Sequence, residues 1–266
     1  VDTVCATPRE IAEGKNTDKV ASDLAEILDM TKEDVLKIIT KKSSYEIIKR
    51  KIEPEQSAKF RELNYKGIYL TEDSKRYYPY GNFASHVIGF VGSDNQGLNG
   101  IEMVYDKYLK GEPGRIITAK NALGSDMPYK YEKYINAQNG VNVVLTIDEV
   151  IQHFAEKELE AAVEKYNVKN GAACIVMNAK TGEILAMATK PDYDLNSPFT
   201  LNNQADIDTM NSLSGEEKTK FFNEACNKMW RNKAVCDTYE PGSTFKTFVT
   251  AMAIEENVVK DNDTFN

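Results

Sequence analysis

The sequence predicts an α+β protein, and three observations support that prediction. Apolar residues recur at helical spacing between residues 18 and 39, which indicates two amphipathic helices. Short apolar runs between glycine-rich turns follow from residue 68 to residue 119 and indicate short strands. The second half then reads as a strand, a long helix, a hairpin and further helices.

Composition excludes several classes of protein. The chain has 266 residues, with 33 basic and 41 acidic side chains and a formal net charge of −8. That balance argues against a nucleic-acid binder and a polybasic membrane-surface protein, because both present basic surfaces. Apolar residues make up 41%, which is enough for a buried core. No stretch reaches the roughly 18 apolar residues of a membrane helix, and no signal peptide begins the sequence.

The first helices are predicted from their apolar positions, three and four residues apart. In the first helix these positions are Val20, Leu24, Ile27 and Leu28. Thr31 is placed to cap the second helix. A third, shorter helix is predicted from Glu53 to Glu62, because Pro54 is favourable in a first helical turn.

Glycine and tyrosine become frequent after residue 67. Three apolar runs between them are predicted as strands, at residues 68–70, 87–91 and 115–119. A further strand is predicted at 141–145, and Thr146 to Glu149 fits a capping box. The helix that follows has an apolar side made of Ile147, Ile151, Phe154, Leu159, Ala162, Val163 and Tyr166.

A hairpin is predicted next, with strands at 172–177 and 183–188. Both strands are apolar on both faces, so we expect a sheet that is covered on both sides. Residues 192–212 are predicted as a long polar loop on the active-site side, and residues 215–229 as a helix.

The strongest chemical signal lies near the end of the sequence. A turn over residues 239–242 precedes Ser243, and Lys246 lies three residues later on the same face of a helix. A serine hydroxyl is a poor nucleophile until a base takes its proton, and a desolvated lysine can be that base. The apolar residues after Ser243 predict a buried helix whose first turn is held at a cleft. The spacing alone also fits an N-cap serine beside a solvated lysine.

The context of this serine resembles the active-site motif of the class B penicillin-binding proteins. The motif is the segment YEPGSTFK, residues 239–246, and the resemblance covers nearly the whole chain. Residues 76–81 (RYYPYG), 84–92 (ASHVIGFVG) and 97–102 (GLNGIE) are similar to the family's N-terminal pedestal. Residues 145–148 with Ile151 and Gln152, 180–187 (KTGEILAM) and 231–234 (RNKA) are similar to its transpeptidase domain.

The resemblance implies a pedestal domain over residues 1–138 and the N-terminal portion of an α/β, β-lactamase-like transpeptidase domain over 139–266. It further implies a peptidoglycan D,D-transpeptidase of the division or sporulation type, in which Ser243 attacks the D-Ala-D-Ala carbonyl and Lys246 is the general base. Implied partners are peptidoglycan stem peptides, β-lactams and a membrane glycosyltransferase. The implied location is the outer face of the bacterial cytoplasmic membrane, through an N-terminal anchor outside this sequence.

The sequence departs from the family after Ser243. The family's S-x-N and K-[ST]-G motifs follow the serine, but Ser93-Asp94-Asn95 and Lys180-Thr181-Gly182 precede it and are interpreted as ordinary turns. We therefore expect a truncated and inactive polypeptide. Two other functions stay open, namely a β-lactam sensor or hydrolase on the same scaffold and a non-catalytic module that recruits wall-synthesis proteins.

Other residues have weaker signals. Cys226 and Cys236 are interpreted as free thiols, a disulfide, or two ligands of a structural zinc site; no other cofactor is expected. His86 is predicted to be structural, His153 to lie at the surface, and Cys174 to be a core residue. Six tyrosines either pack between turns or contact glycan or partner helices, and they are Tyr77, Tyr78, Tyr80, Tyr129, Tyr131 and Tyr134.

Overall fold

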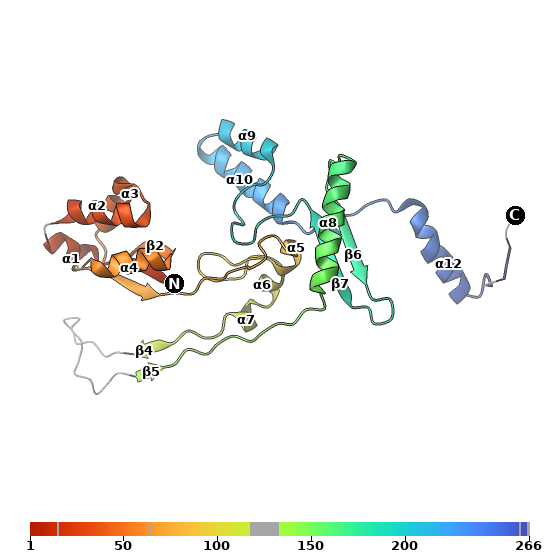
Figure 1. Cartoon of the computed structure of the whole chain (residues 1–266), viewed down its shortest axis with the longest axis horizontal. Coiled ribbons are helices and arrows are strands. Elements are labelled where there is room, and N and C mark those ends of the chain that lie inside the picture. Colours follow the sequence, from red (N-terminus) through yellow and green to blue (C-terminus); the bar gives the residue numbers. More distant parts are fainter. Residues whose placement is uncertain (15, 64, 118–132, 261, 265–266) are drawn as a thin grey trace.

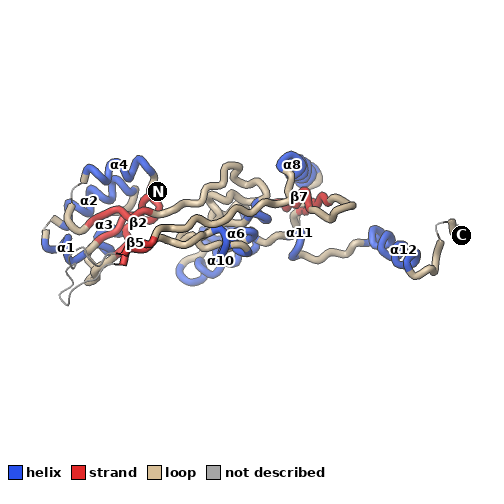
Figure 2. Tube along the Cα trace, turned by 90° about the horizontal axis from the view of Figure 1, so that it is seen from below, coloured by secondary structure: helices blue, strands red, loops and turns tan. Residues whose placement is uncertain are grey.

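The protein is elongated, with a compact N-terminal lobe at one end and a single helix near the other (Figure 1). The computed structural model describes residues 1–14, 16–63, 65–117, 133–260 and 262–264. Seen from below, the lobe is followed by a central body, which is built on residues 73–112. A hairpin covered by a helix and then an extended segment follow it (Figure 2).

The N-terminal lobe is a three-stranded antiparallel sheet of strand order β2-β1-β3, packed against helices. It comprises β1 (Asp2–Ala6), α1 (Pro8–Glu13), α2 (Thr17–Leu28), α3 (Lys32–Ile39), β2 (Glu46–Ile52), α4 (Pro54–Glu62) and β3 (Ile68–Glu72). Its core joins Val4 of the central strand to Leu24, Leu28 and Phe60 of the helices. Because β1 lies between two strands and beneath helices, all five of its residues are buried.

The predicted helices of this lobe are confirmed. The side chain of Thr31 accepts a hydrogen bond from the backbone N–H of Asp34 and so caps α3, as expected. Glu53 caps α4, and Pro54 lies in its first turn. The predicted strand at residues 68–70 is the first part of β3, whereas β1 and β2 were not anticipated.

The predicted strand at residues 87–91 is wrong. Residues up to Ile88 form the short helix α5 (Ser85–Ile88), and only Val91 pairs, in an isolated bridge with Gly97. The reason lies at Gly89, whose φ is +73° and where a Cβ atom would stand 1.9 Å from the carbonyl oxygen of Asn99. The chain must therefore bend sharply at this glycine, which ends the run before a strand can form.

The rest of the central region consists of short elements. They are α6 (Gly100–Val104), α7 (Asp106–Leu109), β4 (Arg115–Ile117) and β5 (Lys133–Ile135). β4 pairs with β5 in an antiparallel arm, which confirms the strand predicted from Arg115 as far as Ile117. Residues 118 and 119 of that prediction lie outside the described residues.

The segment that leads into the second half of the chain differs from the prediction. Residues 141–145 form no strand, and α8 (Glu149–Lys165) is capped by Asp148 rather than by Thr146. The Asp148 carboxylate accepts hydrogen bonds from the N–H groups of Val150 and Ile151. The Thr146 hydroxyl donates to the carbonyl oxygen of Ile184, so it anchors this segment to the hairpin instead.

The predicted hairpin is confirmed as β6 (Ala172–Met177) and β7 (Ile184–Lys190), with α8 across one face (Figure 1). The expectation of a sheet covered on both sides is wrong for the described chain. Ile175 and Met177 on the other face are 48% and 56% exposed. The polar connection after the hairpin is a loop only to residue 203, because its second part forms α9.

Three more helices complete this half, with bounds α9 (Gln204–Ser212), α10 (Gly215–Trp230) and α11 (Lys233–Cys236). The predicted helix at residues 215–229 is thus confirmed. A 3-10 turn (Gly242–Phe245) leads directly into α12 (Lys246–Glu255), which projects away from the other elements (Figures 1 and 2).

Candidate active site

The candidate nucleophile, Ser243, lies in the 3-10 turn that opens α12. Lys246 is the first residue of α12, three positions later. Side chains three positions apart lie one above the other in a 3-10 turn, so the two predicted residues share one side of this turn. The Thr244 hydroxyl donates to the carbonyl oxygen of Pro241 at 2.6 Å, which ties the turn to the proline before it.

The surroundings of this turn differ from the prediction. Ser243 and Lys246 are both exposed, and neither lines the two pockets considered below. The apolar side of α12 is exposed as well, with 66% of Phe248 and 54% of Met252 accessible to water. The expected burial of this helix at a cleft is therefore absent from the described chain, because none of its elements covers α12.

The segment that precedes the serine is held by residues of the central body. The His86 Nε2 atom lies 3.1 Å from the carbonyl oxygen of Met229, and the Asn99 amide donates to the carbonyl oxygen of Trp230 at 3.1 Å. The Asn232 amide donates to the carbonyl oxygen of His86 at 3.4 Å. Residues 229–232 are thus fixed from both directions. Sequence reasoning missed these contacts, because the partners lie more than 130 positions apart.

Asn232 also organises the start of α11. Its side-chain oxygen accepts hydrogen bonds from the N–H of Ala234 at 3.1 Å and from the Thr189 hydroxyl at 3.3 Å. One side chain therefore caps a helix, contacts β7 and contacts the central body. The RNKA segment is thereby held in place ahead of the candidate nucleophile in the sequence.

His86 is a buried structural residue, as predicted. Its ring packs edge-on against Tyr193, with ring centroids 5.1 Å apart. Burial lowers the pKa of His86, since a charged imidazole would lose its hydration there. His153 is exposed on α8, also as predicted. Cys174 is only half-buried, so its assignment to the core is wrong for the described chain.

The pedestal-like motifs build one buried cluster. The Arg76 guanidinium makes a two-pronged contact with Glu102, at 2.7 and 2.9 Å, which joins the first motif to the third. Phe90 of the second motif is fully buried, and its ring centroid lies 4.9 Å from that of Trp230. Tyr78 is also buried in this cluster, while Tyr77 and Tyr80 are exposed.

The two motif-like tripeptides occupy turns, as expected. Residues 93–95 lie in a turn of the central body, where the Asn95 side-chain oxygen accepts a hydrogen bond from Lys51 Nζ at 2.5 Å. Residues 180–182 lie in the turn of the β6–β7 hairpin. The contact with Lys51 connects the first turn to the N-terminal lobe, and neither tripeptide lies beside Ser243 in the sequence.

The two cysteines proposed as zinc ligands lie on different helices. Cys226 is buried in α10 beside Leu201 and Ala225, whereas Cys236 is exposed at the end of α11. Both are free thiols. Across the described residues, no three His, Cys, Asp or Glu side chains group as a metal site would require. Zinc binding by Cys226 and Cys236 stays a prediction.

The remaining tyrosines give no further site. Tyr129 and Tyr131 lie outside the described residues, and Tyr134 is in β5. Their contact with glycan therefore stays a prediction.

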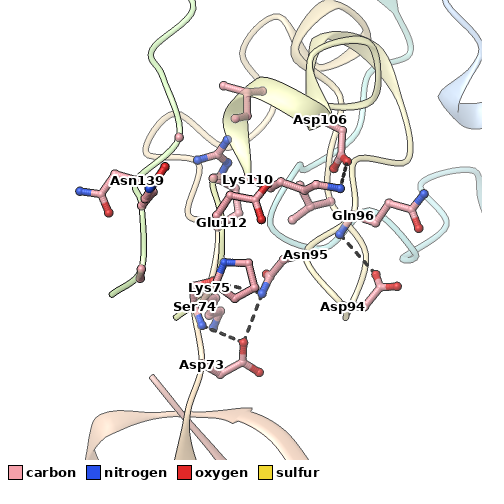
Figure 3. Close-up of a pocket in the computed structure, with 18 of the residues that line it drawn as sticks. Asp73, Ser74, Lys75, Asp94, Asn95, Gln96, Asp106, Lys110, Glu112 and Asn139 are labelled. Carbon is pink, nitrogen blue, oxygen red and sulfur yellow. Dashed lines mark hydrogen bonds and ion pairs between the residues drawn. The ribbon is translucent and has the colours of Figure 1, made fainter. Parts of the chain in front are cut away.

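An open pocket of about 1150 Å³ is lined by residues 72–76 at and after the end of β3, by parts of the segment 91–114 and by residues 137–140. Figure 3 shows Asp73, whose carboxylate accepts hydrogen bonds from the Ser74 N–H and the Asn95 amide. Asp106 and Lys110 form an ion pair at its other side, at 3.1 Å. Its polar groups are thus largely bound to one another, and the pocket contains neither Ser243 nor Lys246.

Comparison with protein-family models gives two matches. Residues 2–145 match the model described as the penicillin-binding protein dimerisation domain, and residues 172–266 match the penicillin-binding protein transpeptidase domain.

Curated relatives agree with these matches. The chain is 40% identical over 260 residues to stage V sporulation protein D of Bacillus subtilis, covering 97% of this chain and 36% of that protein. It is 33% identical over 225 residues to the peptidoglycan D,D-transpeptidase FtsI of Escherichia coli, covering 85% of this chain and 34% of that protein. The chain thus spans little more than a third of these relatives.

Solved structures support the fold. A peptidoglycan synthetase from Bifidobacterium adolescentis and penicillin-binding protein 2X from Streptococcus thermophilus both superpose with a TM-score of 0.58 and 22% identity. Each superposition covers 99% of this chain. It covers 48% of the peptidoglycan synthetase chain and 39% of the penicillin-binding protein 2X chain. The α+β prediction is confirmed. Within the described residues, no helix has both the length and the apolar character of a membrane span.

Proposed function

Because this chain belongs to the class B penicillin-binding proteins, we propose that it supplies the pedestal and the nucleophile segment of a serine D,D-transpeptidase that cross-links peptidoglycan. The observation that carries the proposal is the position of Ser243 in a 3-10 turn at the start of α12, with Lys246 three residues later. The two family matches, in the order dimerisation then transpeptidase, support the same assignment.

In this proposal Ser243 Oγ attacks the carbonyl carbon of the D-Ala-D-Ala bond while Lys246 Nζ accepts the hydroxyl proton. The terminal D-Ala leaves as its amine, which takes that proton from Lys246 Nζ, and the acyl group then passes from Ser243 to the amine of an acceptor stem peptide, whose proton returns to Ser243 Oγ. The backbone N–H of Ser243 would stabilise the oxyanion, because it lies at the start of a helix. A lysine acts as a base at neutral pH only when its pKa is lowered, by desolvation or by a neighbouring positive charge. Lys246 is exposed here, so further protein around this turn would be needed.

We further propose that the central body positions this turn. His86, Asn99 and Asn232 fix residues 229–232, which precede Ser243 by 11 to 14 positions. The substrates would be stem peptides, and β-lactams would acylate the same serine. A membrane glycosyltransferase would be the partner at the outer face of the cytoplasmic membrane.

The test is covalent labelling with a fluorescent penicillin. A form of the protein that continues past residue 266 through S-x-N and K-[ST]-G motifs should be labelled, and Ser243→Ala should abolish the label. Lys246→Ala should slow labelling at least about 100-fold, as loss of a general base does. The 266-residue chain alone should stay unlabelled.

The outcomes separate the other functions. Rapid release of the bound penicillin would indicate a hydrolase, since a transpeptidase keeps its acyl-enzyme. A labelled serine that is dispensable in cells would favour the non-catalytic module. Labelling of the Ser243→Ala variant would overturn the assignment of the nucleophile.

A further inference from the structure

A second pocket, of about 360 Å³, lies beside the segment that leads to Ser243. It is lined by the end of α10, by the start of α11, by residues 169–171 before β6 and by the loop around residues 201–203. Its floor is formed by the buried residues His86, Leu201, Ala225 and Met229. A concave site of this volume with an apolar floor is typical of small-ligand sites.

The rim of this pocket is cationic, although the chain is acidic overall. Four cations line it, and they are Lys169, Lys228, Arg231 and Lys233. Two carboxylates, Asp206 and Asp237, oppose them, whereas the whole chain carries a formal charge of −8. Positive charge gathered in a concave site concentrates anions from solution.

The fold fixes one of these cations in place. Gly171 has a φ of +82°, and a Cβ atom there would stand 2.8 Å from Lys233 Cε. The glycine therefore leaves the space in which the Lys233 side chain packs. Only 24% of that side chain is exposed, so little conformational freedom remains to be lost when it binds an anion.

The carboxylate of Asp237 already forms ion pairs with two of these cations. Arg231 Nε lies 2.5 Å from one oxygen of Asp237, and Lys233 Nζ lies 3.4 Å from the other. The hydrogen bond from Arg231 lowers the pKa of Asp237. Among the described residues, Lys228 makes no ion pair, and Lys169 donates only to the side-chain oxygen of Asn167.

We propose that this pocket binds a small anionic ligand that carries carboxylate or phosphate groups. Lys169 and Lys228 hold one anionic group, and the apolar floor around Met229 contacts the rest of the ligand. A second anionic group competes with Asp237 for Arg231 and Lys233. The site is separate from the proposed transpeptidase chemistry, since no step of that chemistry uses it.

The test is isothermal titration calorimetry of the 266-residue chain at constant ionic strength, with inorganic phosphate in one series and glutarate in the other. We expect saturable binding to one site. The anion with the lower Kd shows whether the pocket prefers a phosphate or a carboxylate group. Lys228→Ala should weaken binding about five-fold, as loss of one partly exposed ionic contact does. Lys220→Ala, on the same helix but outside the pocket, should leave it unchanged.

The change in affinity on removal of the Asp237 charge tests the proposal more specifically, because Asp237 would compete with the added anion. Asp237→Asn should tighten binding at least two-fold, whereas loss of a merely structural ion pair would weaken it or leave it unchanged. Ser243→Ala should bind as the parent chain does. Absence of saturable binding, or equal losses for Lys228→Ala and Lys220→Ala, would overturn the site. If circular dichroism shows that Asp237→Asn does not fold, the affinities of Lys169→Ala and Lys220→Ala are compared instead. Weaker binding by Lys169→Ala alone would support the site, and equal affinities would overturn it.

Discussion

Gln152 joins helix α8 to strand β7 through its side-chain amide. Its oxygen accepts a hydrogen bond from the N–H of Met187 at 2.7 Å, and its nitrogen donates to the carbonyl oxygen of Met187 at 3.1 Å. The same nitrogen donates to Glu156 at 2.7 Å. The amide thus pairs with the backbone as a neighbouring strand would, and no part of Gln152 is exposed.

We predict that Gln152→Ala lowers the free energy of unfolding by about 2–3 kcal/mol, because it leaves the N–H and C=O of Met187 without partners. Gln152→Glu keeps an acceptor for the Met187 N–H but sets a buried carboxylate oxygen against Glu156 and the Met187 carbonyl oxygen, so it should cost at least as much. His153→Ala changes the exposed neighbour and should stay within about 0.5 kcal/mol. Urea denaturation measures all three, and equal effects of Gln152→Ala and His153→Ala would contradict the prediction.

At the scale of residues, local spacing predicted the candidate site, but it did not predict burial. Ser243 and Lys246 were singled out because their relation is local; the structure places them in a 3-10 turn and at the first residue of α12, and their catalytic roles stay a prediction. The apolar side predicted for α8 was misleading, since Phe154 and Tyr166 are exposed and Gln152 is buried. A polar residue is buried when a backbone elsewhere pairs with it, and periodicity carries no record of that partner.

At the scale of elements, the start of α8 depends on Asp148. Its carboxylate accepts two backbone N–H groups, and its own N–H donates to the carbonyl oxygen of Leu185 at 2.8 Å. The helix start is therefore fixed to the hairpin as well as capped.

Asp148→Ala should lower the free energy of unfolding by about 1 kcal/mol, the usual cost of losing an N-cap. Asp148→Ser restores a capping oxygen and should recover most of that loss. Thermal unfolding followed by circular dichroism at 222 nm measures both variants. A capping role for Asp148 fails if the serine variant is as unstable as the alanine variant.

The longer helices and the hairpin were predicted well, and strands whose partners are distant in the sequence were predicted poorly, for a physical reason. A helix satisfies its own backbone, so the apolar pattern of α2 and the cap of α3 were sufficient. A strand needs a partner that the local sequence does not name. Residues 141–145 have strand-like composition but pair with no strand in the described part of the chain, whereas the central strand β1 has two partner strands from distant segments.

At the scale of the whole molecule, the described residues form three clusters of buried core. One lies in the N-terminal lobe and includes Leu24, and a second joins Phe90 to Tyr193 and Met229. The third, around Cys226, packs against Trp230 as the second does, so the second and third form one continuous body. The second body therefore takes residues from both sides of the predicted boundary at 138, and that boundary stays a prediction. A polar contact between Lys51 and Asn95 links the lobe to the central body.

These separate cores predict two unfolding transitions in differential scanning calorimetry. Leu24→Ala, at a fully buried site, should cost about 2–5 kcal/mol and lower only the transition of the N-terminal lobe. Phe90→Ala should cost about 3–5 kcal/mol and lower only the other. Phe248→Ala, on the exposed side of α12, should move neither by more than about 0.5 kcal/mol. A single transition that both core variants shift equally would show instead that contacts such as Lys51–Asn95 make the lobe and the body unfold as one unit.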